Sequence, residues 1–437
     1  MPSTRRQFLF GALAAPVFAQ KKRAPEPPNI LLILADDLGD WMLGCYGNKE
    51  IRTPNIDRLA ATGMRFLNSL CCTPVSSAAR ATLFTGRVPR QTGVVDFVTA
   101  NPTGNPPQGQ AAPPPSFAKE IMISDILAGQ GYNCGYVGEW RLGDDAQPQH
   151  GFKSWNVIST GTEPVTDKAC QFLDQQAAGK PFFLTAGYSN PHPPYDRLAK
   201  KYLDMYAGVN FETFGYEPMA KNAARDKEMF ADFVGNLRKC AASTTALDDQ
   251  LPVLMNKLRQ RSLLDSTLII LTSDTGLLLG QHGVWGRGLA SDPINMYEEA
   301  MGVPTIFSWL GRVPPTNTRP ELISSYDLLP TVCEAAGAPL AQGHNLCGRS
   351  YLPLVFNQKL PKKEPWRNLV FGHYRNTEMA RDNRYKLVLR DEGKTPGELY
   401  DLVVDPHEKA NQYSNPQFVS VRDRLAADLA AWRKKYS

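Results

Sequence analysis

The sequence predicts an α/β fold with a large, mostly parallel sheet flanked by helices, followed by a smaller C-terminal α+β domain with a short antiparallel sheet. Over most of the chain, short apolar segments of strand length alternate with amphipathic segments of helical length, which is the pattern of a parallel sheet covered on both faces. From about Leu360 the pattern changes to several short strand-like segments and one final helix. A separate antiparallel sheet accounts for that change.

The core strands are recognised as apolar runs that end at polar residues. The first run, at 29–34, ends at Ala35-Asp36-Asp37, and the run at 266–272 is the most strand-like segment of the chain. The other core strands are expected at 132–137, 181–186 and 303–309.

The helices are recognised by their ends. Thr53 as the N-cap, Pro54 at the first helical position and Gly63 as the stop delimit the first helix. Further helices are expected at 77–85, 124–128, 166–177, 244–261 and 326–336. The segment 196–239 has weak periodicity and is interpreted as an insertion, a kind of segment in which substrate selection often lies. In the C-terminal domain, strands are expected at 368–373, 378–379, 385–390 and 398–402, and a helix at 418–434.

The composition is that of a folded globular protein. Of 437 residues, 42% are hydrophobic and 21% charged, which excludes a disordered, a collagen-like and a multi-span membrane protein. The net charge of +5 is small and no basic stripe is present, so nucleic acid is not an expected partner. Eight cysteines in so long a chain are not a disulfide framework, although the sequence leaves open whether one or two disulfides form. Because no CxxC pair is present, no structural zinc site is expected.

Residues 1–19 have the pattern of an export signal. Arg5-Arg6 precede an apolar run that is too short to span a bilayer and that ends in Val17-Phe18-Ala19. The arginine pair is similar to that of a bacterial twin-arginine signal. We therefore expect export of the folded protein by the twin-arginine machinery to the periplasm or beyond, with residues 20–28 as a tether. A frayed basic terminus is the alternative.

Acidic or imidazole side chains follow three of the predicted strands. Asp36 and Asp37 follow the first strand, His192 lies just past the strand at 181–186, and Asp274 follows the strand at 266–272. In open α/β sheets, ligands bind beyond the carboxyl ends of the strands. These residues are therefore expected to converge on one functional site.

The segment 73–87, Thr-Pro-Val-Ser-Ser-Ala-Ala-Arg-Ala-Thr-Leu-Phe-Thr-Gly-Arg, carries the most informative pattern. Ser76 is expected at a helix N-terminus, where free N–H groups and the helix dipole favour anions. Arg80 lies four residues later, on the same helical face. A hydroxyl-derived nucleophile beside a guanidinium suits attack on a tetrahedral oxyanion ester. Taken alone, a serine at this place is more often a simple N-cap.

This segment resembles the sulfatase signature, in which Cys or Ser is followed by x-(Pro or Ala)-x-Arg and then by Thr-Gly-Arg. Further matches occur in order along the chain: Asp36-Asp37 after the opening strand, the helix at 53–60, Ser273-Asp274 with His282-Gly283 and Trp285-Gly286, and Glu398-Leu399-Tyr400-Asp401-Leu402. The resemblance implies an alkaline-phosphatase-like core at 29–358 and a C-terminal subdomain at 359–437.

What the resemblance implies is a sulfuric ester hydrolase, with a carbohydrate sulfate as the expected substrate. In sulfatases the signature residue is oxidised to formylglycine, so Ser76 is expected to become an aldehyde whose hydrate attacks sulfur. A Ser-type signature implies a radical maturase in the cytoplasm. Arg80 and His192 match catalytic positions. Ca²⁺, or Mg²⁺ as the alternative, is expected on Asp36, Asp37, Ser76, Asp274 and Thr275, and substrate binding on Arg287, His282 and Arg141.

Two segments depart from the family pattern. Gly138-Glu139-Trp140-Arg141-Leu142-Gly143 stands where Gly-Lys-Trp-His-Leu-Gly is usual, so that Lys is replaced by Glu139 and His by Arg141. Asp274 is followed by Thr275, where Asn or His is usual, and Arg287 replaces a Lys with its charge kept. A carboxylate beside a sulfate is unfavourable unless Arg141 pairs with it.

These departures leave three hypotheses about function. The first is a working sulfatase with altered leaving-group chemistry. The second is a hydrolase of phosphate or phosphonate esters from the same superfamily. The third is a catalytically silent protein that binds sulfated glycans.

Overall fold

A computed structural model describes residues 27–98, 110–111, 114, 116–143 and 146–436. The predicted signal peptide at 1–19 and most of the tether at 20–28 lie outside these residues. Among the described residues, no helix combines the length and the apolar character needed to cross a membrane. All eight cysteines are described and all are free thiols, so the one or two disulfides that the sequence left open are not formed.

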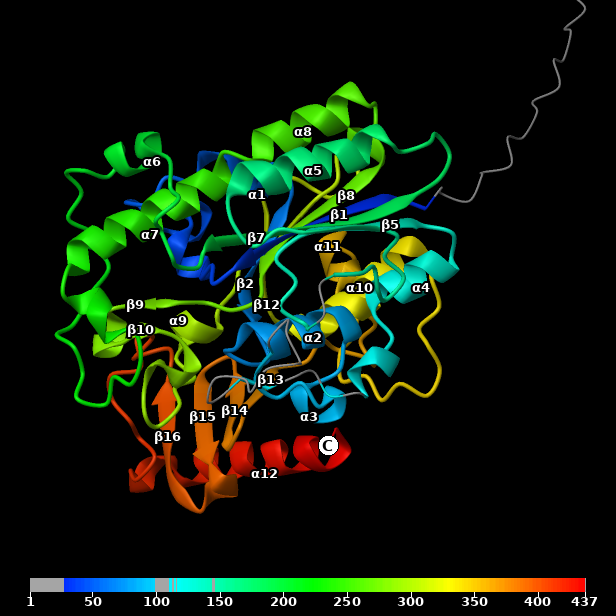
Figure 1. Cartoon of the computed structure of the whole chain (residues 1–437). Helices are drawn as coiled ribbons and strands as arrows, with labels where there is room; N and C mark the ends of the chain where they lie inside the picture. Colours follow the sequence, from blue (N-terminus) through cyan, green and yellow to red (C-terminus); the bar gives the residue numbers. More distant parts are fainter. Residues whose placement is uncertain (1–26, 99–109, 112–113, 115, 144–145, 437) are drawn as a thin grey trace, which may run out of the picture.

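In the described residues, an eight-stranded sheet forms the centre of the molecule (Figure 1). Its strand order is β12-β2-β11-β8-β1-β7-β5-β6, and only β11 runs antiparallel to its neighbours. The strands are β1 (Asn29–Asp36), β2 (Met64–Leu70), β5 (Asn133–Gly138), β6 (Ser154–Val157), β7 (Phe182–Pro191), β8 (Thr267–Ser273), β11 (Thr305–Ser308) and β12 (Asn317–Ser324). The predicted large, mostly parallel sheet is confirmed.

Helices cover both faces of this sheet (Figure 1). On one face lie α1 (Pro54–Ala61), α5 (Thr162–Asp174), α7 (Phe233–Asp248) and α8 (Leu251–Gln260). On the other lie α2 (Ser76–Thr85), α4 (Ile123–Gly129), α10 (Leu328–Ala336) and α11 (Leu352–Val355). Alternate residues of β1 enter the two opposite cores, which explains why this strand is a continuous apolar run rather than an alternating one.

The prediction of a single helix at 244–261 is wrong, because two helices, α7 (Phe233–Asp248) and α8 (Leu251–Gln260), occupy this region. Helix α7 begins at Phe233, where the side chain of Asp232 accepts a hydrogen bond from the N–H of Gly235, and it ends at Asp248. Helix α8 begins afresh with Pro252 in its first turn, a position that proline favours. The expected insertion at 196–239 therefore includes the start of α7.

Asp248, at the break, caps a different helix. Its carboxylate accepts hydrogen bonds from the backbone N–H groups of Asn55 and Ile56 at the start of α1, at 3.0 and 2.7 Å. Thr53, the predicted N-cap, occupies the cap position but its side chain makes no capping hydrogen bond. The cap of α1 is thus supplied from a helix far along the chain.

Three core strands, β2, β6 and β12, carry no clear pattern in the sequence. β12 contains Pro320, and its pairing with β2 shifts register between Arg319 and Leu322. Both features are tolerated because β12 is an edge strand, where a missing N–H disturbs no ladder. β6 forms the opposite edge and all four of its residues are half-buried.

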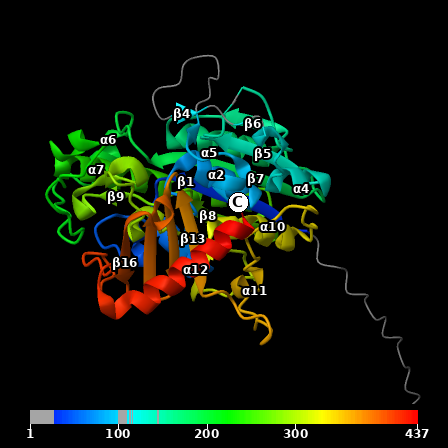
Figure 2. The ribbon, with the colours of Figure 1, turned by 90° about the horizontal axis from the view of Figure 1, so that it is seen from below.

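The C-terminal part forms a four-stranded antiparallel sheet that packs beside the core (Figure 2). Its strands, in order, are β13 (Leu369–Tyr374), β14 (Thr377–Asp382), β15 (Tyr385–Arg390) and β16 (Thr395–Asp401). Helix α12 (Val419–Lys435) lies across this sheet, with Leu425, Leu429 and Trp432 buried against it. Short elements complete the described fold: α3 (Pro89–Thr92), β3 (Phe97–Val98) with β4 (Gln110–Ala111), α6 (Lys200–Asp204), β9 (Leu278–Leu279) with β10 (Trp285–Gly286), and α9 (Glu298–Met301).

A buried ionic cluster joins this sheet to the core. Lys386 on β15 is fully buried and lies 3.0 Å from Glu298 of α9 and 2.5 Å from Glu408. The neighbouring Glu299 lies 3.8 Å from His282 and 3.6 Å from His407. Charged groups removed from water in this way must be paired, which binds the two parts of the molecule to one relative position.

Glu299 is expected to make stability fall in acid. Burial would raise its pKa, but the neighbouring imidazole groups of His282 and His407 lower it to about 2. Because the folded-state pKa lies below that of the unfolded chain, its contribution is present above about pH 4.5 and is lost as the pH falls toward 2. In melting experiments between pH 6 and 3, Glu299→Gln is expected to show a shallower decline of Tm than the parent. Parallel curves would contradict this.

Candidate active site

The carboxyl ends of three neighbouring strands bring the predicted acidic residues together. Strand β1 lies between β7 and β8 and runs parallel to both, with Ala35 opposite Ser273 and Asp36 opposite Pro191. Asp36 and Asp37 at the end of β1 therefore lie beside Asp274 after β8 and His192 after β7. The backbone N–H of Asp37 donates to Asp274 Oδ1 at 3.2 Å. The convergence expected from the strand ends is confirmed.

Ser76 faces these carboxylates from the first turn of α2. Val75 holds the N-cap position, so Ser76 is the first helical residue and its hydroxyl caps nothing. Its Oγ donates to Asp36 Oδ1 at 2.9 Å and accepts from Arg287 Nη2 at 2.7 Å. The simple N-cap explanation of this serine is therefore wrong, and its fully buried hydroxyl lies between a carboxylate and a cation.

Arg80 lies one turn further along α2 and is also fully buried. Its Nε donates to Asp274 Oδ2 at 2.8 Å, and its Nη2 lies 3.5 Å from Asp36 Oδ2. Its Nη1 donates to the Tyr136 hydroxyl at 3.4 Å and to the carbonyl of Glu139. Arg80 therefore bridges two of the three carboxylates, and Tyr136, which sequence reasoning did not single out, helps to hold it.

Two further arginines complete the charge pattern. Arg287 Nη1 lies 2.5 Å from Asp37 Oδ2. Arg141 contacts Asp36 Oδ2 through both Nε and Nη2 at 3.0 Å, and its Nε lies 3.4 Å from Glu139. The pairing that would make Glu139 tolerable near a sulfate is thus present. We define the Ser76 cluster as the following residues: Asp36, Asp37, Asp274, Arg80, Arg141, Arg287, Ser76, Thr275 and His192.

Burial and mutual repulsion shift the pKa values of the carboxyl groups. Burial raises the pKa of Asp37 to about 7 against the opposing charge of Arg287, and it raises the pKa of Asp274 to about 6 with the help of Asp36. Burial would also raise the pKa of Asp36, but the surrounding cations, Arg141 first, hold it well below its usual range. Burial therefore favours the neutral form of Asp37 and Asp274, whereas the surrounding arginines keep Asp36 ionised.

His192 lies at the edge of the cluster. Its Nδ1 bonds to the carbonyl of Pro193, and its Nε2 lies 3.9 Å from Asp37 Oδ2. Burial lowers its pKa, with Asp36 acting in the opposite direction. The side chain is 24% exposed, so it can be reached from outside.

The oxygen-rich donor set fits a hard cation. Asp36, Asp37 and His192 each offer one ligand atom within 4.8 Å of the others, and Thr275 donates to Asp37 Oδ1 at 2.8 Å. Carboxylate and hydroxyl oxygens are the ligands that Ca²⁺ and Mg²⁺ prefer. His192 joins this group, although the sequence predicts it only as a catalytic residue. Asp226, which the sequence did not single out, interacts electrostatically with Arg287 and His192.

His282 is the one predicted site residue that the structure places elsewhere. Its ring stacks on Tyr297 at 3.6 Å, and its Nε2 lies 3.8 Å from Glu299. These contacts belong to the ionic junction with the C-terminal sheet, so the contacts of His282 do not support its predicted role in substrate binding. His282 lies in the turn between β9 and β10, whereas Arg287 follows β10, so the two side chains reach different surroundings although they are close in sequence.

Comparison with known proteins agrees with this geometry. A family model described as Sulfatase matches residues 28–338, which is more than half of the chain. The chain belongs to the sulfatase family. A second model, described as the C-terminal region of N-sulphoglucosamine sulphohydrolase, matches residues 282–435. The protein is therefore a sulfatase, a hydrolase of sulfate esters.

Named relatives of this sulfatase act on sulfated compounds. It is 27% identical to an ulvan-active sulfatase of Formosa agariphila, over 94% of this chain and 80% of that protein. It is 30% identical to the N-acetylgalactosamine-6-sulfatase of Sus scrofa, over 82% of this chain and 70% of that protein.

Solved structures confirm the alkaline-phosphatase-like fold. One, in complex with its substrate D-glucosamine-2-N,6-O-disulfate, matches with a TM-score of 0.77 and 23% identity, over 94% of this chain and 98% of that one. The phosphonate monoester hydrolase of Agrobacterium radiobacter shares the fold with a TM-score of 0.75 and 20% identity, over 94% and 96% of the two chains. The fold alone therefore does not separate sulfate from phosphonate esters.

The charge exchange at Glu139 and Arg141 gives a prediction about this sulfatase. Arg141→His alone removes the cation that pairs with Glu139 and one of those that pair with Asp36, so we expect kcat/KM for an aryl sulfate to fall by about 10–100-fold. Adding Glu139→Lys removes the unpaired carboxylate and is expected to recover most of that loss. Steady-state kinetics of the two single variants and the double variant measure the coupling. Additive effects would contradict it.

Proposed function

We propose that this sulfatase hydrolyses a sulfate ester of a carbohydrate through a formylglycine derived from Ser76, with a bound Ca²⁺ or Mg²⁺. The observation that carries this proposal is the position of the Ser76 hydroxyl, fully buried and 2.9 Å from Asp36 and 2.7 Å from Arg287. The named carbohydrate sulfatases among its relatives support the substrate class.

Formylglycine supplies a hydrated aldehyde whose oxygen attacks sulfur. The residues of this chain bind and orient the ester around it. The guanidinium groups of Arg80 and Arg287 offer donors that suit sulfate oxygens. His192 is exposed enough to reach the leaving oxygen, and an anionic ester beside it would raise its lowered pKa toward the range in which it can protonate that oxygen.

The chemical state of residue 76 tests this proposal. Trypsin cleavage after Arg65 and Arg80 releases a peptide of residues 66–80. After co-expression with a radical-type maturase, mass spectrometry of this peptide is expected to show the aldehyde in place of serine, together with turnover of an aryl sulfate. Unmodified serine with turnover of an aryl phosphate would instead support the phosphate or phosphonate hydrolase. Neither turnover, with retained binding of a sulfated oligosaccharide, would support the silent binding protein.

Asp36, Asp37, Asp274 and Thr275, together with the oxygen of residue 76, are proposed to hold the cation, while His192 at the edge of this donor set protonates the leaving oxygen. Adding Ca²⁺ to chelator-treated protein is expected to stabilise it by about 2.7 kcal/mol at a hundred times Kd. For a chain of this size that is a rise in Tm of a few degrees, on the order of 3 °C. Asp37→Asn is expected to abolish the rise, while Asp167→Asn, an exposed carboxylate on α5, keeps it. An equal rise in both variants would place the cation elsewhere.

We also propose export by the twin-arginine machinery, supported by Arg5-Arg6 and the apolar run after them. Maturation of Ser76 in the cytoplasm agrees with export in the folded state. Fractionation of cells is expected to find the protein in the periplasm or the medium, and a variant with both Arg5 and Arg6 replaced by Lys in the cytoplasm. Export of that variant would contradict the proposed route.

A further inference from the structure

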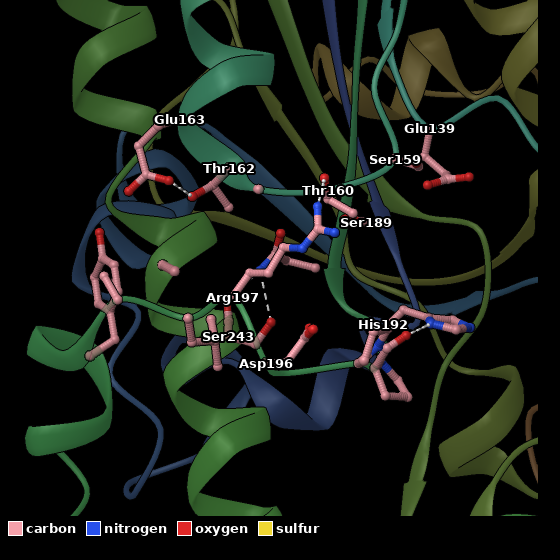
Figure 3. A pocket seen from close by; sticks show the side chains of 18 of the residues that line it. Glu139, Ser159, Thr160, Thr162, Glu163, Ser189, His192, Asp196, Arg197 and Ser243 are labelled. Atoms are coloured by element: carbon pink, nitrogen blue, oxygen red, sulfur yellow. Dashed lines mark hydrogen bonds between the residues drawn. The ribbon is translucent and has the colours of Figure 1, made fainter.

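A cavity of about 280 Å³ opens beside the Ser76 cluster (Figure 3). Glu139, Arg141 and His192 form the wall that it shares with the cluster. The remaining lining comes from the loop at 159–161 with the start of α5, from the end of β7 with the loop at 193–199 after it, and from α6 and α7. A group joined to an ester at His192 therefore has this cavity as its neighbouring space.

The size of this side cavity restricts what it can hold. Ligand pockets typically range from about 300 to 1,000 Å³, so this one is at the small end. Arg197 Nη1 donates to Thr160 Oγ1 at 2.8 Å, which joins the two loops across the cavity. Figure 3 shows the Arg197 side chain extended between Thr160 and the Asp196 segment, with Glu139 and His192 on one side of it and Glu163 on the other. One small ring fits this space better than a continuous polymer.

The lining of the side cavity suits hydroxyl groups. Three carboxylates, of Glu139, Glu163 and Asp196, face two guanidinium groups, of Arg141 and Arg197. Arg141 is already paired with Asp36 and Glu139. Within the described part of the chain, the side chain of Arg197 has only one polar partner, the neutral hydroxyl of Thr160. Sugar hydroxyls both donate and accept, so they satisfy such a mixed lining. Three carboxylates against two guanidinium groups leave the lining with an excess of negative charge, which disfavours a second anion.

We propose that the side cavity is the subsite for a single terminal sugar that carries the sulfate ester, that Arg197 positions this sugar, and that the cavity selects sugars without a second anionic group. This inference rests on the proposed function, since it concerns the leaving group of the same reaction. It assigns exo action to the enzyme, because a sugar within a chain would need space on both sides.

Binding without turnover tests the subsite first. Saturation-transfer NMR on the Ser76→Ala protein uses the methyl glycosides of glucose, galactose, N-acetylglucosamine and N-acetylgalactosamine as probes. At least one is expected to bind, and adding Arg197→Ala is expected to weaken it by about tenfold, because one charged hydrogen bond is lost. Arg58→Ala, an exposed arginine on α1, is the matched control. Binding of none of the four, or equal binding with and without Arg197, would overturn the subsite.

Turnover by the matured protein tests the selection. The sugar that binds is supplied as its monosulfates, and the best of these is compared with the same sugar carrying an additional sulfate. We expect kcat/KM to be at least about tenfold lower for the second compound. For an oligosaccharide, we expect release of sulfate from a terminal residue but not from an internal one. Equal rates in either comparison would overturn the corresponding part of the proposal.

The failure of this inference can be told apart from failure of the proposed function. If residue 76 is unmodified and aryl sulfate is not cleaved, the proposed reaction fails, and the NMR measurement still decides whether Arg197 binds a sugar. If aryl sulfate is cleaved but Arg197→Ala lowers kcat/KM equally for the aryl sulfate and the sugar sulfate, the reaction stands and the subsite is wrong. A loss at least about tenfold greater for the sugar sulfate supports both.

Discussion

Replacement of Ser76 by alanine is expected to lower kcat/KM for an aryl sulfate by at least about 10⁴-fold in the matured protein. Ser76 is the source of the proposed nucleophile, and its hydroxyl is the group held between Asp36 and Arg287. An alanine cannot be oxidised to an aldehyde, so neither the modified nor the unmodified nucleophile is present. Steady-state kinetics at saturating Ca²⁺ measure the loss.

Ser77→Ala is the matched control for this change. Ser77 is equally buried on the same helix turn, but its Oγ accepts a hydrogen bond from the N–H of Val98 at 2.9 Å. The variant is expected to lose about 1 kcal/mol of stability and to keep its activity within about threefold. If Ser76→Ala kept more than about 1% of the parent rate, another residue would have to supply the nucleophile.

Arg80→Gln is expected to reduce both stability and activity. The guanidinium compensates Asp36 and Asp274 in a site that water does not reach, so its loss leaves two buried carboxylates underpaired. Breaking a buried pair from one side costs about 3–5 kcal/mol. With a sulfate-binding donor also removed, kcat/KM is expected to fall by about 10²–10³-fold. Denaturant unfolding and aryl sulfate kinetics measure the two effects.

Two variants separate pairing from catalysis at this position. Arg87→Gln removes a partly exposed pair with Glu120 at 3.3 Å and is expected to cost less than about 1 kcal/mol. Arg80→Gln with Asp274→Asn removes both charges of the buried pair, so it is expected to recover part of the stability but none of the activity. Recovery of activity in that double variant would falsify the role of Arg80 in binding the ester.

The core strands and the signature were predictable because their signals are local. A strand buried on both faces must be an apolar run, as β1 and β8 are, and residues four apart on a helix, such as Ser76 and Arg80, share a face. Edge strands give weaker signals, since β12 can contain Pro320 and polar residues without breaking a ladder. The break between α7 and α8 was missed although Pro252 signals it, because the apolar periodicity continues across the break.

The placement of single side chains was less predictable. Asp248 caps α1 from 193 positions away in the sequence, and His282 points to Glu299 rather than to the Ser76 cluster. Neither contact leaves a local pattern, because each depends on how a loop or helix end packs against a distant element.

Local patterns were enough to predict which chemical groups this sulfatase gathers: three carboxylates and a histidine after its strands, and a serine one helical turn before an arginine. They were enough because parallel strands present their carboxyl ends at one edge of a sheet. The pairing among these groups became visible only in the folded protein, where Arg287 contacts Ser76 across 211 positions and Arg141 contacts both Asp36 and Glu139. Pairing follows from distances of a few ångströms, and in a buried site those distances are set by the packing of the elements that carry the residues.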